Sequence, residues 1–133
     1  MSVHSLLRRT CFGIALAALT LPGVPTFAEP LAYTTVGFEE AQTSGKPVLV
    51  HVTAPWCSVC AAQKPILSKL EAEPRFKALQ VFDVDFDHQK EAVQSFGARM
   101  QSTLIVYRDG KEVGRSAGET KPEAIEALLD KAV

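Results

Sequence analysis

Residues 48–67 read VLVHVTAPWCSVCAAQKPIL, and this stretch decides the fold. Its first part belongs to a predicted strand, KPVLVHVT, at residues 46–53. This segment is rich in β-branched residues and almost entirely apolar, as expected of a strand buried on both faces. The stretch ends within SVCAAQKPILSKLEAE, residues 58–73, whose apolar residues recur at helical spacing. We expect Pro65 to kink this helix, because proline lacks an N–H group and clashes with the preceding turn. A pair of cysteines therefore lies where a buried strand passes into a helix.

The rest of the sequence alternates between helical and strand patterns. Strands that alternate with helices favour parallel pairing, and a closing hairpin adds antiparallel strands. The sequence thus predicts an α/β fold with a mixed sheet, and it places the cysteines at the carboxyl end of a central strand, where such sheets carry their chemistry. In the first half of the chain, we expect a helix at 36–45, the strand at 46–53, the helix from 58 and a strand at 79–86. A helix at 89–96, capped by Asp87, and a hairpin at 103–117, which turns at Asp109-Gly110, follow. A final helix begins with a capping box at 120–123 and reaches about residue 132.

The first 28 residues have a different pattern. Two arginines precede an apolar run at residues 10–21, and small residues then lead to Ala28. This arrangement predicts a secretory signal peptide that is cleaved after Ala28, leaving a single domain at 29–133. The alternative is an uncleaved membrane anchor, for which the run is short, because spanning a bilayer takes about 20 apolar residues. The arginine pair leaves both the general and the twin-arginine export routes open.

Composition and charge narrow the class of protein. Of the 133 residues, 47% are hydrophobic and 22% charged, which is typical of a globular domain. The formal net charge of -1 gives no electrostatic reason to expect nucleic acid or an anionic membrane as a partner. We therefore expect no nucleic-acid partner, and a mature form that is not bound to a membrane.

Export would place the domain in an oxidising compartment, the bacterial periplasm, where disulfides persist. There Cys57 and Cys60 could form a structural disulfide, contribute to a zinc site or act as a redox dithiol. A structural disulfide gains more from closing a long loop than from closing one this short. A zinc site needs four ligands, and adding His51 and His88 completes the count, but their order and spacing do not match a zinc finger.

The dithiol chemistry fits the position of the two cysteines. Cys57 falls at the amino end of the predicted helix, where free N–H groups and the helix dipole favour a thiolate. Cys60, one turn later, can reach back and resolve a mixed disulfide. We expect Trp56 and Pro55 to form an apolar rim that shields the pair and offers a docking surface, although a tryptophan alone is more often ordinary packing.

The sequence resembles the thioredoxin family over essentially all of residues 29–133. The features that match in order are the Trp-Cys-x-x-Cys motif, Pro65, the TLIVYRDGK hairpin and Gly118. The resemblance implies a thioredoxin fold, with a central mixed β-sheet flanked by helices on both faces. It also implies a reversible Cys57–Cys60 disulfide, attack by Cys57 and resolution by Cys60. The implied substrates are proteins with disulfides or thiols, and the implied chemistry needs no cofactor and no metal beyond this dithiol.

The sequence departs from the family pattern at Ser102, where the family almost always has a cis-proline that faces the active site. A cis peptide before a non-proline residue costs about 3 kcal/mol, so the Gln101–Ser102 peptide is either trans or held cis by its surroundings. The family's proline helps to dock substrate and keeps metals from the cysteines. The Ser102 hydroxyl could hydrogen-bond a Cys57 thiolate, or the serine could be a tolerated loop substitution.

Two further departures lie beneath the cysteines. His51 occupies a position where the family usually buries an acid that helps to deprotonate the resolving cysteine. An imidazole can exchange a proton near neutral pH and could serve this purpose, or His51 could be an ordinary core residue. Asp83 occupies a position where thioredoxins often carry a lysine that pairs with the acid. The hypothesis is a His51–Asp83 pair with the signs exchanged; the alternative is a solvated carboxylate at a strand end.

The direction of electron flow does not follow from the motif. The residues between the cysteines, Ser-Val, match neither the reducing nor the strongly oxidising members, but the absence of an inserted helical domain favours a reductase with an unidentified upstream redox partner. A competing hypothesis is a metal-binding or metal-delivery protein that uses Cys57 and Cys60 with Met100 or His51. A redox-inert binding module fits the intact motif poorly.

Overall fold

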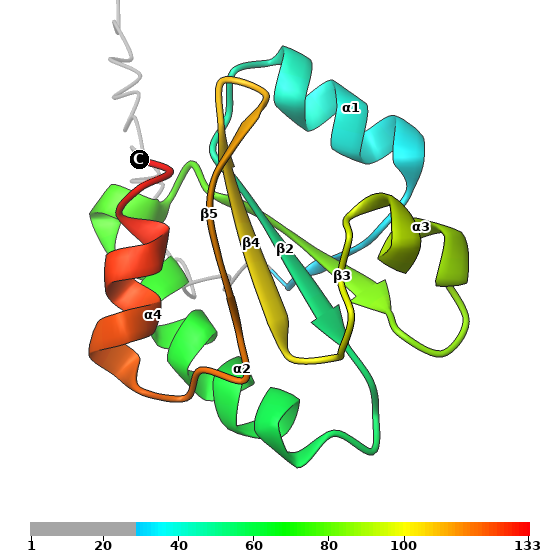
Figure 1. Ribbon diagram of the computed structural model, residues 1–133. Coiled ribbons are helices and arrows are strands. Elements are labelled where there is room, and N and C mark those ends of the chain that lie inside the picture. The colour runs from blue at the N-terminus through cyan, green and yellow to red at the C-terminus, as the bar shows by residue number, and fades with distance from the viewer. Residues whose placement is uncertain (1–28) are drawn as a thin grey trace, which may run out of the picture.

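The computed structural model describes residues 29–133 and contains a mixed five-stranded sheet with helices on both faces (Figure 1). The predicted signal peptide at 1–28 lies outside the described residues. In chain order, the elements are β1 (Leu31–Ala32), α1 (Thr35–Thr43), β2 (Val48–Thr53), α2 (Ser58–Glu71), a short 3-10 helix η1 (Pro74–Phe76), β3 (Gln80–Asp85), α3 (Lys90–Ser95), β4 (Thr103–Arg108), β5 (Lys111–Ala117) and α4 (Pro122–Leu129).

The sheet has the order β1-β3-β2-β4-β5, with β2 at its centre. β2 runs parallel to β3 and antiparallel to β4, and this register places His51 directly beside Asp83. β4 and β5 form the predicted hairpin, which turns at Asp109 and Gly110, both with positive φ. The parallel pairing and the closing antiparallel hairpin confirm the mixed sheet expected from the sequence.

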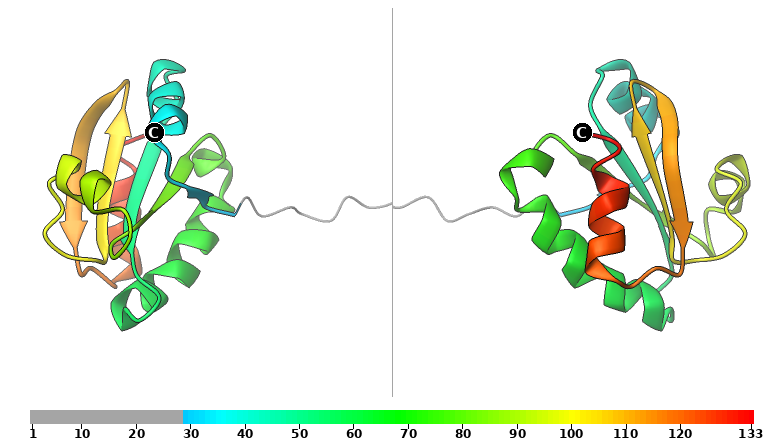
Figure 2. Two further views of the ribbon diagram at one scale, coloured as in Figure 1. Left: turned by 90° about the vertical axis from the view of Figure 1, so that its right-hand side faces the viewer. Right: turned by 60° about the vertical axis from the view of Figure 1, so that its left-hand side comes forward.

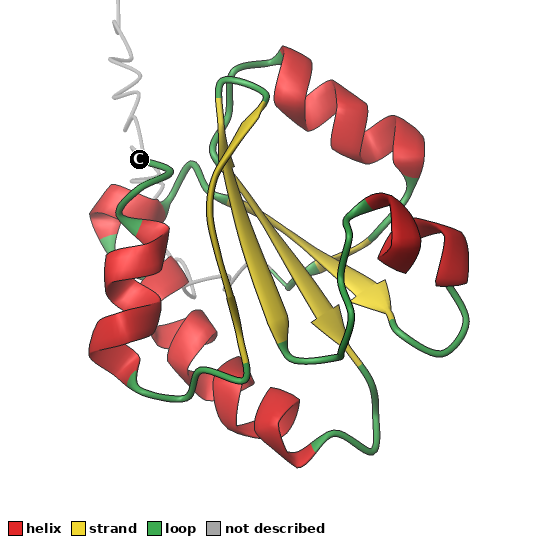
Figure 3. Cartoon of the chain, viewed as in Figure 1, coloured by secondary structure: helices red, strands yellow, loops and turns green. Residues whose placement is uncertain are grey.

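The helices divide into two layers, with α2 and α4 on one face of the sheet and α1 and α3 on the other (Figures 2 and 3). Alternation along the strands gives two large core clusters, one beneath each layer, and a third, small cluster contains the two cysteines. Leu49 and Leu104 belong to the cluster under α2 and α4, whereas Val50 and Ile105 belong to the other. β2 is buried on both faces, as its unbroken apolar sequence predicts.

The structure corrects two predicted helix starts. Asp87 does not cap α3, which begins at Lys90, because its carboxylate accepts the indole N–H of Trp56 instead. The predicted capping box at 120–123 is also absent: α4 begins one residue later, after Lys121, and the Glu119 carboxylate accepts the N–H groups of Thr120 and Lys121. β1 and η1 were not predicted from the sequence, since two or three residues are too few to show a helical or strand periodicity.

α2 runs from Ser58 to Glu71 with Pro65 inside it, so the proline does not end the helix, and the kink expected there stays a prediction. Within residues 29–133, the structure contains no helix long and apolar enough to cross a membrane.

Candidate active site

Cys57 and Cys60 form a disulfide where β2 passes into α2. Cys57 is the N-cap of α2, and its Sγ accepts a hydrogen bond from the Cys60 backbone N–H at 3.0 Å. The Cα atoms of the two cysteines lie 5.3 Å apart, the ordinary spacing for a disulfide. The free N–H groups of the first helical turn therefore face Cys57, which is the sulfur expected to carry negative charge after reduction.

The disulfide is largely covered, whereas its neighbour Trp56 is exposed. Cys57 and Cys60 are 5% and 1% exposed, but Trp56 is 61% exposed. The Trp56 indole Nε1 donates to the Asp87 carboxylate at 2.6 Å, which fixes the ring from across the loop after β3. Trp56 is therefore an anchored, exposed aromatic ring beside a covered disulfide, and the docking surface expected from the sequence stays a prediction.

His51 and Asp83, which the sequence suggested as a pair, are in contact beneath the site. His51 is 1% exposed, and its Nδ1 lies 3.1 Å from the Asp83 carboxylate. The other ring nitrogen, Nε2, lies 3.1 Å from the side-chain oxygen of Gln63. The β2–β3 register produces the first contact and the start of α2 the second, so both His51 nitrogens are engaged.

Gln63 is a site residue that sequence reasoning missed. It lies one turn after Cys60 on α2, is fully buried, and its side-chain nitrogen donates to the backbone carbonyls of Ser102 and Glu119 at 3.1 and 2.9 Å. A polar residue on the buried side of a helix was the available signal. Gln63 connects the helix of the cysteines to the loops on both sides of the β4–β5 hairpin.

Ser102 is buried immediately before β4, and its preceding peptide is trans. Its φ of 59° is in the left-handed region, which is unusual for a serine. The hydroxyl donates to the Gln101 carbonyl, and the Ser102 carbonyl accepts from Gly118 N–H at 3.0 Å as well as from Gln63. In this oxidised state the Ser102 hydroxyl is therefore turned to the backbone, and a bond to a Cys57 thiolate stays a prediction for the reduced state.

A cleft of about 560 Å³ opens beside the site and exposes Asp83. Thr53 and Pro55 line it from the β2–α2 connection, and Lys64 lines it from α2. Asp83 keeps 26% of its side chain exposed, whereas His51 behind it is covered. Solvent therefore reaches the Asp83 carboxylate but not the His51 ring.

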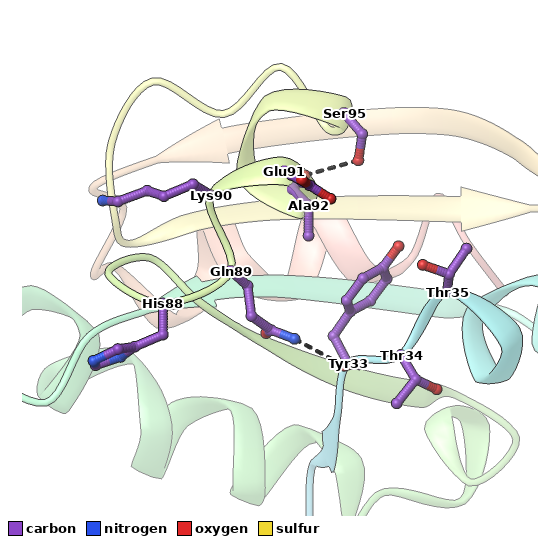
Figure 4. Close-up of a pocket in the computed structure, with 9 residues that line it drawn as sticks. All are labelled: Tyr33, Thr34, Thr35, His88, Gln89, Lys90, Glu91, Ala92 and Ser95. Carbon is purple, nitrogen blue, oxygen red and sulfur yellow. Dashed lines mark hydrogen bonds between the residues drawn. The ribbon is translucent and has the colours of Figure 1, made fainter.

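A larger hollow of about 730 Å³ lies away from the cysteines, between α3 and the β1–α1 connection (Figure 4). Tyr33 and Gln89 line it, and the Gln89 side chain donates to the Tyr33 carbonyl at 3.0 Å. Neither cysteine reaches this hollow, so size alone does not identify the reactive site.

The zinc ligand set suggested by the sequence, the two cysteines with His51 and His88, is not assembled in the part of the chain that the structure describes. Residues 29–133 contain no group of three His, Cys, Asp or Glu side chains that could hold a metal ion. His88, which completed the zinc ligand count, contacts Asp85 instead at 2.9 Å. Hydrogen bonds from His88 are the main cause that lowers the pKa of Asp85.

The fold and the site together define a class of protein. A central strand leads into a helix whose amino end carries a three-residue-spaced disulfide, with an exposed tryptophan beside it. Such a pair exchanges thiols and disulfides with other molecules and needs no cofactor beyond its own sulfurs. The chain is a thiol–disulfide oxidoreductase.

Comparison with known proteins identifies the family. The family model described as thioredoxin matches residues 30–131. The chain is 35% identical to thioredoxin of Bacillus subtilis over 91 residues, which is 68% of this chain and 86% of the relative. Thioredoxin Asp f 29 of Aspergillus fumigatus is 31% identical over 91 residues, covering 68% of this chain and 82% of its own. The crystal structure of Trxlp from Edwardsiella tarda EIB202 is 50% identical, with a TM-score of 0.74, and covers 76% of this chain and 98% of that one. The chain belongs to the thioredoxin family.

Proposed function

We propose that this oxidoreductase acts on the disulfides of other proteins in the bacterial periplasm, and that its working direction is reduction. The observation that carries the proposal is the Cys57–Cys60 disulfide at the amino end of α2, beside the exposed Trp56. The thioredoxin family acts on protein disulfides in general, which supports the substrate class.

Two further observations support the location and the direction. The pattern of residues 1–28 is that of an export signal, and the chemistry of a disulfide suits an oxidising compartment. The element order from β1 to α4 has no inserted helical domain, as in proteins that act as reductants.

The direction is tested by the reduction potential of the Cys57–Cys60 pair, measured by equilibration with glutathione, together with catalysis of insulin reduction. A potential of about −270 mV, as in thioredoxin, would support a reductant. A potential of about −120 mV would establish an oxidant instead. The Cys57→Ser variant is the matched control and should show no catalysis.

The location is tested by osmotic-shock fractionation of cells that express the whole chain. Release into the shock fluid as a shortened chain supports cleavage and a periplasmic site of action. Retention in the cytosol would overturn the proposed location, and full-length protein in the membrane fraction would replace it with an anchored form.

A further inference from the structure

The buried amide of Gln63 fixes the arrangement of hydrogen atoms under the disulfide. Its nitrogen lies within hydrogen-bond distance of two backbone carbonyls, those of Ser102 and Glu119. Carbonyls only accept hydrogen bonds, so the nitrogen must face them and the amide oxygen must face His51. Exchanging the two ends of the amide would bring three acceptors together in a buried place, which is strongly unfavourable.

This orientation dictates which nitrogens of His51 carry protons. The Gln63 oxygen lies 3.1 Å from Nε2 and can only accept, so Nε2 must carry a hydrogen. The opposite nitrogen, Nδ1, lies 3.1 Å from the Asp83 carboxylate, which also accepts. A second proton is therefore needed between Nδ1 and Asp83. Because imidazole is a stronger base than a carboxylate, that proton belongs on His51.

We propose that Gln63 is a positioning residue that holds buried His51 as an imidazolium paired with the Asp83 carboxylate, and that this charge pair raises the reduction potential of the Cys57–Cys60 disulfide. The second half rests on the proposed function, since it concerns the redox reaction, whereas the first half stands on hydrogen bonding alone. Both ring nitrogens are engaged, so in this proposal His51 acts on the disulfide by its charge.

The pair lies close enough to the sulfurs to affect them. Gln63 follows Cys60 by one turn on the same buried side of α2, and residues so spaced have Cβ atoms about 5–6 Å apart. Because the His51 ring contacts Gln63, its charge is within one layer of side chains of Cys60, whose sulfur is bonded to that of Cys57. Charges interact strongly in a buried place, where solvent screening is weak.

The sign follows from the balanced reaction. A partner dithiol gives two electrons and two protons and becomes a disulfide, while the Cys57–Cys60 bond breaks. Of the two protons, one stays on Cys60 as a thiol. The other is released to solvent, which leaves Cys57 as a thiolate. A nearby imidazolium stabilises this thiolate and therefore the reduced state. Losing the imidazolium charge should make the disulfide harder to reduce.

Other charged groups face the pair from the neighbouring elements. Asp85 on β3 and His88 after it share the cleft with Asp83, and Lys64 on α2 lines the same cleft. Glu71, at the end of α2, is close enough to Asp83 that the two carboxylates influence each other. None of these residues is replaced in the variants below, and Gln63→Leu also keeps Asp83, so the difference between Gln63→Leu and the wild type reports on His51.

The first test reads the His51 ring by nitrogen-15 NMR of the oxidised whole chain at pH 7. We expect both ring nitrogens to be protonated in the wild type. In Gln63→Leu the Nε2 proton should be lost while Nδ1 still donates to Asp83. In Asp83→Asn the amide can donate to Nδ1, so the opposite proton, on Nδ1, should be lost.

The second test equilibrates the same proteins with glutathione. Gln63→Leu changes the net charge of the pair from neutral to negative, and we expect a tenfold smaller equilibrium constant for reduction, which corresponds to a potential lower by about 30 mV. Gln94→Leu, at an exposed position on α3, is the matched control and should equal the wild type.

Two results would contradict the proposed protonation of His51 and its effect on the disulfide. A wild-type His51 with a single ring proton, or an unchanged equilibrium constant in Gln63→Leu, would overturn the proposal. Should Gln63→Leu fail to fold, the nearly isosteric Asp83→Asn decides, because retention of both ring protons there would also overturn it. The ring readout needs no substrate, so a chain that fails to reduce insulin would refute the proposed function without deciding the protonation of His51.

Discussion

Replacing Glu71 by glutamine should stabilise the protein at alkaline pH and leave it unchanged in acid. Glu71 ends α2 and is half-buried; burial, and secondly the charge of Asp83, raise its pKa from 4.5 to about 7. A raised pKa means that the folded state binds this proton more tightly than the unfolded chain does. The resulting stability is fully present below about pH 4.5 and is lost as the pH rises through 7.

The size of the effect follows from the rise in pKa. At face value, a change from 4.5 to about 7 corresponds to about 3 kcal/mol. Solvent screens a half-exposed carboxylate, so we expect about 1–1.5 kcal/mol. Glutamine resembles the protonated acid at every pH. The free energy of unfolding of Glu71→Gln should therefore exceed that of the wild type by this amount at pH 8 and by nothing at pH 4.

The assay is urea unfolding of the oxidised chain, followed by circular dichroism between pH 4 and 8. Other groups also titrate in this range, so the quantity that matters is the difference between variant and wild type. Glu39→Gln, on the exposed side of α1, removes the same charge without burial and is the control. A difference that does not change with pH, or one that the control reproduces, would refute the reasoning.

Three further predictions concern the cysteines, Ser102 and a surface cluster. Cys57→Ser should abolish insulin reduction, whereas Cys60→Ser should accumulate a mixed disulfide with substrate, visible on a non-reducing gel; a Cys57→Ser protein that still turned over would contradict the assigned order of attack. Ser102→Pro should lower the free energy of unfolding by at least about 2 kcal/mol, because proline requires a φ near −65° and Ser102 has 59°; equal urea midpoints would show that the loop can rearrange. Arg75→Ala removes exposed contacts with Glu73, Glu126 and Asp130 and should cost less than about 1 kcal/mol, so a larger loss in the same urea titration would show that these ions act as a network.

Much of the fold could be predicted from the sequence because its signals are local. The apolar run of β2 and the helical stripe of α2 show their periods within one segment, and Asp109-Gly110 marks a hairpin turn by itself. Local rules were insufficient where a polar side chain had several possible hydrogen-bond partners. Asp87 looked like a helix cap, but the Trp56 indole, from another loop, occupies its carboxylate.

The site, too, could be predicted only where its residues are neighbours in the sequence. The sequence by itself determined the reactive pair and its place at a helix start, because Cys57 and Cys60 are neighbours on one segment. It also singled out His51 and Asp83, but only the parallel register of β2 and β3 brings them to 3.1 Å. The sequence marked Gln63 only as a polar residue on the buried side of a helix and did not identify its partners, because these come from β2 and from two loops more than one element away. Such contacts depend on how the sheet and α2 pack, so only the tertiary structure decided what surrounds the disulfide.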